Sequence, residues 1–302
     1  MQFQSILAPK SSPRGSPLST LVLVIASFLA GPACAQDLPN RNDDLITQMK
    51  QALQRGDKAR LTALLPQARG HILEPWAAYW ELKARLQEAS PLEVRDFLAR
   101  YAGSYQEDRL RNDWLLLLGQ RRDWDGFTAL HPAYRMGDDR EVRCYAVLAD
   151  TLKRGGTPAT KVQAEQVRRD WHAQREADDG CTQAAGAMMS AQLMSPDDAW
   201  KKARLSIEAN RPKAARDAIN LVAPDTLPLF EELNQGAPKF LAGRAVVAVK
   251  SRKEMVVLAL VKIAIADPDA AALQLDSKWG PMLSPEERNW LWGAIGRQAA
   301  TK

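Results

Sequence analysis

The chain has 302 residues, of which 46% are apolar and 25% are charged, and its formal net charge is +5. These proportions are typical of a globular protein with a substantial core, and they exclude an intrinsically disordered chain. The small net charge does not predict nucleic-acid binding.

The first 35 residues resemble a secretory signal peptide. Lys10 and Arg14 form a sparse basic region, and an apolar run follows over Leu18–Ala30. The run is short for a membrane span, which needs about 20 residues. Small residues follow it at the positions that a signal peptidase recognises, so cleavage is favoured over an uncleaved membrane anchor. We predict cleavage between Ala35 and Gln36 and export to the periplasm. Without Lys10 and Arg14 the net charge of +5 becomes +3 (5 − 2).

The rest of the chain has a helical pattern. Residues 36–42 form a short predicted tail, and residues 43–302 form one predicted helical domain with about twelve to fourteen helices. A typical apolar stripe has the spacing i, i+3, i+4, i+7 and consists of Val94, Phe97, Leu98 and Tyr101. Met255–Ile265 is almost wholly apolar and predicts a helix buried on most sides.

Helix boundaries are marked by capping residues. Serine, proline and an acidic third position begin three predicted helices, at Ser90–Glu93, Ser195–Asp198 and Ser284–Glu287. Glycines predict helix ends at Gly56, Gly103, Gly119 and Gly155.

A loose turn motif recurs, in which one helix ends and Asp or Pro begins the next. It occurs at Arg55–Asp57, Arg121–Asp123, Asn210–Pro212 and Ala266–Pro268. The intervals are unequal, so the pattern is not a consensus tetratricopeptide array. We therefore predict an all-α fold, an irregular superhelix of stacked helix pairs, which is an α-solenoid that resembles tetratricopeptide arrays without their consensus.

The segment "LRNDWLLLLGQRRDW", residues 110–124, predicts one such helix pair. Trp114 and Trp124 are expected to fill the spaces between neighbouring pairs, and Asp123 is expected to cap the second helix.

Cys144 and Cys181 are the two cysteines that remain after the predicted cleavage. An oxidising compartment favours a disulfide between them, and the alternative is two buried thiols.

No catalytic, cofactor-binding or metal-binding constellation is recognisable. The three histidines, His71, His131 and His172, lack metal-ligand spacing. Lys250, Arg252 and Lys253 predict a solvated turn. Trp76 and Trp80 lie at i, i+4, which favours core packing over sugar stacking.

Acidic doublets are the feature closest to a catalytic pattern. Paired carboxylates can act as acid and base on a glycosidic bond, but most of these doublets precede or begin predicted helices, where they compensate the helix dipole. They are Asp43–Asp44, Asp138–Asp139, Asp178–Asp179, Asp197–Asp198, Glu231–Glu232 and Glu286–Glu287.

Several segments together resemble the soluble lytic murein transglycosylases of Gram-negative bacteria. They are "YWELKARL", "VRDFLARYAGSYQEDRLRNDWL", "LRNDWLLLLGQRRDWDGF", "MGDDREVRCYAVLA" and "LSPEERNWLWGAIGRQAA". The resemblance is to the N-terminal superhelical region of that family and extends from about Asp43 to the last residue. It implies a periplasmic protein whose partners are peptidoglycan glycan strands and other cell-wall proteins, with no cofactor, no nucleic acid and no membrane anchor after cleavage.

In that family, a C-terminal lysozyme-like domain cleaves the glycan with a glutamate in a Glu-Ser-x-Phe motif, near a Gly-Leu-Met-Gln motif. This sequence contains neither motif, so no catalytic residue carries over. We therefore expect an incomplete scaffold without activity of its own, with an exposed apolar patch where the next helix pair would stack. Two alternatives stay open: a periplasmic helical adaptor that binds protein or peptidoglycan, and an enzyme whose site is unrecognised.

Overall fold

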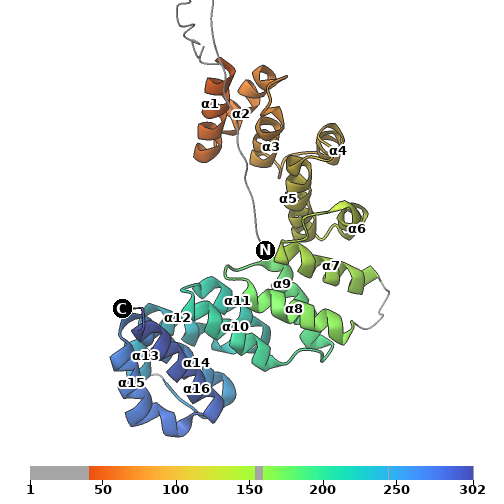
Figure 1. Cartoon of the computed structure of the whole chain (residues 1–302). Coiled ribbons are helices and arrows are strands. Elements are labelled where there is room, and N and C mark those ends of the chain that lie inside the picture. The colour runs from red at the N-terminus through yellow and green to blue at the C-terminus, as the bar shows by residue number, and fades with distance from the viewer. Residues whose placement is uncertain (1–40, 154–158, 244, 302) are drawn as a thin grey trace, which may run out of the picture. The chain divides into compact units, whose positions relative to one another are not determined.

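The computed structural model describes residues 41–153, 159–243 and 245–301. Within these ranges the regular elements are helices, sixteen of them α-helices, and there is no strand (Figure 1). The predicted all-α class is confirmed. The predicted signal peptide, its cleavage site at Ala35 and Gln36, and the helix end at Gly155 lie outside the described residues.

The helices follow one another with short connections. Their bounds are α1 Arg41–Arg55, α2 Lys58–Leu64, α3 Glu74–Ala84, α4 Pro91–Arg100, α5 Tyr105–Arg121, α6 Trp124–Leu130, α7 Arg140–Lys153, α8 Lys161–Ala173, α9 Asp179–Ser190, α10 Pro196–Glu208, α11 Pro212–Val222, α12 Leu227–Gln235, α13 Ala237–Gly243, α14 Lys250–Ala266, α15 Pro268–Gln274 and α16 Pro285–Ala299. The number exceeds the prediction because α2, α6, α13 and α15 have only seven residues each. The first helix begins at Arg41, two positions before the expected start.

Three of the four predicted turns share one geometry. Gly56, Arg122 and Asn210 have φ values of 69°, 60° and 56°, and each follows the last turn of a helix. In each case the next N–H reaches back to a carbonyl five residues earlier: Asp57 to Ala52, Asp123 to Leu118 and Arg211 to Ser206. This pairing satisfies carbonyls that a helix end leaves free, so the motif is a helix-ending device repeated between stacked pairs.

The predicted capping serines take their places at Ser90, Ser195 and Ser284, each as the N-cap of a helix with a capping box. The predicted helix end at Gly119 is wrong, because Gly119 lies inside α5 and the helix ends at Arg121. A Cβ atom at position 119 would lie 2.5 Å from the ring of Tyr145 in α7. The glycine is therefore required by the close approach of two helices.

We expect Gly119→Ala to lower the free energy of unfolding by about 1–3 kcal/mol, because the added methyl displaces a buried ring. Gly296→Ala in α16 is the matched control, since a Cβ there meets no atom within 4 Å. It should stabilise by about 0.5 kcal/mol through helix propensity. Urea melts of both variants measure this, and equal stability of the two would contradict the packing role.

The apolar core consists of three clusters that follow the chain. The first contains side chains of α1 to α3, the second those of α3 to α7, and the third those of α7 to α16. Helices α3 and α7 each contribute to two clusters: in α7, Tyr145 belongs to the second cluster and Cys144 to the third. This succession is what a stack of helix pairs produces.

Helix α14 forms the centre of the third cluster, with every residue of Met255–Val261 at most 1% exposed. The prediction of a buried helix over Met255–Ile265 is confirmed. In the last elements, Leu273, Met282 and Trp292 are 68%, 37% and 45% exposed. The predicted apolar stacking patch stays a prediction.

Candidate functional site

The two predicted cysteines are joined in the structure. Cys144 of α7 and Cys181 of α9 form a disulfide with their Cα atoms 4.8 Å apart. Both side chains are fully buried. The bond connects the two helices that precede and follow α8.

A set of charged groups surrounds the start of α9, beside that disulfide. Asp178 is the N-cap of the helix and accepts a hydrogen bond from the Cys181 N–H at 2.6 Å. Its second oxygen is buried and has no partner among the described residues. Desolvation, aided by the negative charges of Glu141 and Asp179, raises the pKa of Asp178 to about 7.

Lys202 of α10 interacts electrostatically with this carboxyl group. It is 2% exposed and donates hydrogen bonds to the carbonyls of Trp171, at 2.7 Å, and Gln174, at the end of α8. Burial lowers its pKa to about 8. The ammonium therefore completes a helix end, which is a structural task.

We expect Asp178 to make the fold less stable as pH rises from 4 to 7. Its native pKa of about 7 lies above the ordinary value of 3.8, so only the native state keeps this proton within that window. Asn at 178 retains a good N-cap without ionising. From pH 4 to pH 7, the free energy of unfolding of the wild type should therefore fall relative to that of the Asp178→Asn variant, by an amount on the order of 2 kcal/mol. Urea melts at pH 4, 5.5 and 7 measure this, and a pH-independent difference would contradict it.

The three histidines lie apart, each with a local role. His71 contacts Asp43 at 3.1 Å, and His172 contacts the Asp198 carbonyl at 3.0 Å. His131 stacks on Phe127 with ring centroids 5.4 Å apart. In the part of the chain that the structure describes, no group of three or more His, Cys, Asp or Glu side chains could hold a metal ion.

Five of the six acidic doublets lie at helix starts, as the capping interpretation predicts. Examples are Asp197–Asp198 in the first turn of α10 and Glu286–Glu287 in the first turn of α16. The exception is Glu231–Glu232, which lies within α12 because that helix begins already at Leu227. The structure does not gather the doublets into one cleft of paired carboxylates.

The predicted solvated turn at Lys250, Arg252 and Lys253 is wrong. These residues form the first turn of α14, where Lys250 contacts Glu254 at 3.0 Å and Glu287 at 3.3 Å. Two acidic partners stabilise helical geometry at a site that looks like a basic surface loop in the sequence.

The four tryptophans that the sequence analysis names are packing residues. Trp76 and Trp80 are half-buried, with ring centroids 6.0 Å apart, and both pack against the second core cluster. Trp114 is 5% exposed, and Trp124 is half-buried against Tyr145. Asp123 caps α6 as predicted, by accepting from the Gly126 N–H at 2.9 Å.

The polar residues before Trp114 hold neighbouring segments in place, a role that their sequence pattern does not reveal. Asn112 accepts from the Tyr134 hydroxyl at 2.7 Å and donates to Asp139 at 3.1 Å. Asp113 accepts from the Tyr79 hydroxyl of α3 at 2.7 Å. These two side chains fix the loop before α7 and helix α3 to α5.

A buried ion pair joins α10 to α14. The guanidinium of Arg204 donates to both oxygens of Glu254 at 2.9 and 2.7 Å, and also to Glu286 of α16 at 2.6 Å. Arg204 is 3% exposed and Glu254 is fully buried. The cluster connects three helices through an ion pair that is buried, so its role is structural.

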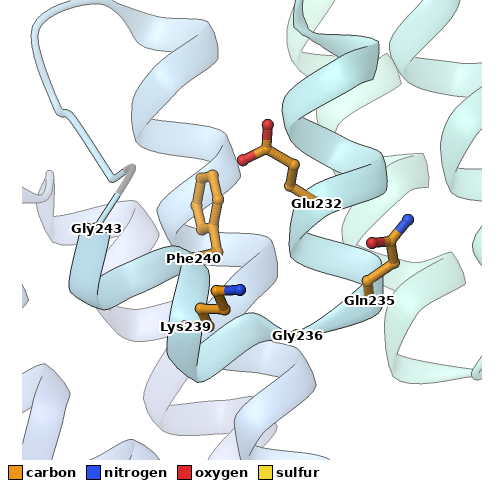
Figure 2. Close-up of a pocket in the computed structure, with 6 residues that line it drawn as sticks. All are labelled: Glu232, Gln235, Gly236, Lys239, Phe240 and Gly243. Atoms are coloured by element: carbon orange, nitrogen blue, oxygen red, sulfur yellow. The ribbon is translucent and has the colours of Figure 1, made fainter.

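A hollow of about 520 Å³ lies where α12 meets α13 (Figure 2). Figure 2 shows Glu232 of α12 and Phe240 of α13 directed toward the space between the two helices. Lys239 also lines it, so one carboxylate and one ammonium are present.

A second hollow, here called the α6–α8 groove, has a volume of about 550 Å³. It is lined by side chains that follow or belong to α6, α7 and α8: Phe127, Thr128, His131, Pro132, Arg143, Ala146, Val147, Asp150, Gln163 and Gln166. It combines apolar side chains with planar polar ones, which is the composition of a binding site.

Among solved structures, the chain is similar to the 70 kDa soluble lytic transglycosylase from Escherichia coli. The TM-score is 0.50 at 16% identity, over 85% of this chain and 42% of that one. A complex of a 70-kDa soluble lytic transglycosylase with bulgecin A gives 0.49 at 16% identity, over 85% and 42% of the chains. An inactive mutant of a lytic transglycosylase from Pseudomonas aeruginosa gives 0.48 at 25% identity, over 85% and 41%.

The likeness to the Escherichia coli structure shows a shared helical fold. The chain spans about two fifths of the length of these proteins, since the alignments cover 42% or 41% of their chains. No family model and no curated protein matches the chain. None of the helices in the described ranges is both long and apolar enough to cross a membrane.

Proposed function

We propose that this chain is the helical scaffold region of a soluble lytic murein transglycosylase, exported to the periplasm, where it holds peptidoglycan for cleavage. The observation that carries the proposal is the fold, which aligns over 85% of the chain with the Escherichia coli transglycosylase. The ordered family-like segments of the sequence, from "YWELKARL" to "LSPEERNWLWGAIGRQAA", support it independently.

A scaffold is also the role that the arrangement of polar groups favours. The charged side chains of lowest exposure, among them Arg204 and Lys202, form ion pairs or complete helix ends. Catalysis needs acid–base groups that reach a reacting bond, whereas these groups connect helices. We therefore assign binding and positioning to this chain, without a catalytic residue.

Export is supported by the signal-like first 35 residues and by the Cys144–Cys181 disulfide, which is typical of oxidising compartments. Expression with its own leader in a Gram-negative host tests this. The protein should appear in the periplasmic fraction with Gln36 as its first residue and with no thiol that reacts before reduction. A cytoplasmic protein with free thiols would contradict it.

Murein binding is tested by incubating the folded chain with purified peptidoglycan sacculi and, separately, with immobilised periplasmic proteins. Loss from solution onto sacculi supports the proposal. Capture by protein alone would instead favour the adaptor alternative.

A further inference from the structure

The α6–α8 groove is built by three consecutive helices of the stack. Phe127 and Thr128 come from α6, Ala146 and Val147 from α7, and Gln166 from α8. Its volume of about 550 Å³ lies within the usual range of small-ligand sites, about 300–1,000 Å³.

One wall of the groove is formed by apolar side chains and the ring of His131. The ring of His131 stacks on that of Phe127, with an angle of 15° between the planes and 5.4 Å between centroids. Phe127 is only 1% exposed, so the half-buried His131 covers it and lines the groove beside Ala146 and Val147, while the Tyr134 ring lies 6.4 Å from the imidazole. Such a surface suits a ligand with an apolar face.

Within the described residues, two side chains of the groove carry polar groups that are free to form hydrogen bonds. The ring nitrogens of His131 and the amide of Gln166 have no hydrogen-bond partner there, whereas Gln163 is bound to Asp150 at 2.8 Å and to Thr160 at 2.9 Å. Burial lowers the pKa of His131, which keeps the ring neutral at pH 7. Together the two side chains offer both donors and acceptors.

The charged groups of the groove are already paired. Arg143 donates to both oxygens of Asp170 at 2.9 and 2.6 Å, and Asp150 accepts from Gln163. The groove therefore offers no free ion to a phosphate or another charged ligand, and its single positive and single negative lining groups cancel.

We propose that the α6–α8 groove binds a neutral saccharide. The C–H face of a sugar ring would pack on the wall formed by His131, Ala146 and Val147, while hydroxyl or acetamido groups would pair with the imidazole and with Gln166. The choice of an N-acetylated sugar as probe rests on the proposed function; the class of ligand follows from the groove.

Titration of the folded chain with N,N′,N″-triacetylchitotriose, followed by calorimetry or amide NMR, tests the proposal. Gln166→Ala and His131→Ala should each weaken binding by about 5- to 10-fold, the usual worth of one hydrogen bond. Lys239→Ala, in the hollow of Figure 2, is the matched control and should bind normally. Circular dichroism checks that each variant is folded.

Absence of binding at about 10 mM probe, a concentration that would nearly saturate a site with a Kd of about 1 mM, would overturn the proposal. So would equal binding by wild type and by Gln166→Ala, which leaves the ring stack intact. Sacculus binding that persists without any chitotriose binding would overturn this inference and leave the proposed function standing. If the chain binds chitotriose, the variants weaken that binding, and the chain does not bind sacculi, the result would support the saccharide site in the groove and contradict the proposed function.

Discussion

Glu254→Ala is expected to lower the free energy of unfolding by about 3–5 kcal/mol, because it leaves the buried charge of Arg204 without its partner. Glu254 is fully buried and receives two hydrogen bonds from Arg204 at 2.9 and 2.7 Å. The guanidinium would keep its ion pair with the exposed Glu286 and its contact with the Trp290 ring at 5.4 Å, and neither replaces the buried pair.

Two matched variants sharpen the measurement by urea melts. Glu286→Ala removes a carboxylate whose side chain is 63% exposed, and it should cost less than about 1 kcal/mol. Replacing both buried partners, with Arg204→Met and Glu254→Leu in one chain, should cost much less than Glu254→Ala alone. A Glu254→Ala protein within about 1 kcal/mol of wild type would show that the pair is solvated.

Trp114→Ala is expected to cost about 3–5 kcal/mol, the usual loss for a large aromatic core residue. Its side chain is 5% exposed within the second core cluster, and the Arg121 guanidinium lies 5.9 Å from its ring centroid. Removal of the ring would leave a cavity at the contact of α4, α5 and α6.

Trp292→Ala is the control for that variant, since Trp292 is 45% exposed in α16. It should cost less than about 1 kcal/mol. Denaturant melts of the two variants give the comparison. A Trp114→Ala protein as stable as the Trp292→Ala protein would remove Trp114 from the core.

The features that the sequence predicts well are local ones. Capping boxes such as Ser90–Glu93 involve residues three positions apart, and the buried helix over Met255–Ile265 is recognisable from its apolar residues alone. The turn motif, which has only two or three residues, likewise predicts turns. The positive φ at Gly56 and Asn210 depends on residues next to them in the sequence.

The features that the sequence does not predict depend on distant contacts. Arg204 and Glu254 are 50 positions apart, and nothing in either segment indicates a buried partner. Gly119 looks like a helix end because its contact with Tyr145 has no local signal. The basic residues after Val249 look like a loop because Glu287, which pairs with Lys250, comes from another helix.

The α6–α8 groove could not be predicted from the sequence, for the same reason. His131 and Gln166 are ordinary residues in separate segments, and only the packing of α6 and α8 on α7 brings them to one hollow. The cysteine pair was the easier case, because two thiols in a chain that is predicted to be exported have few alternatives.

The fraction of folded protein that sediments with murein sacculi tests the central claim most directly. The account predicts saturable binding that persists at about 0.15 M salt, where exposed charge attraction is largely screened, and that soluble glycan fragments displace. Binding that disappears at this salt concentration, or that glycan fragments do not displace, would contradict the assignment of this chain as a murein-holding scaffold.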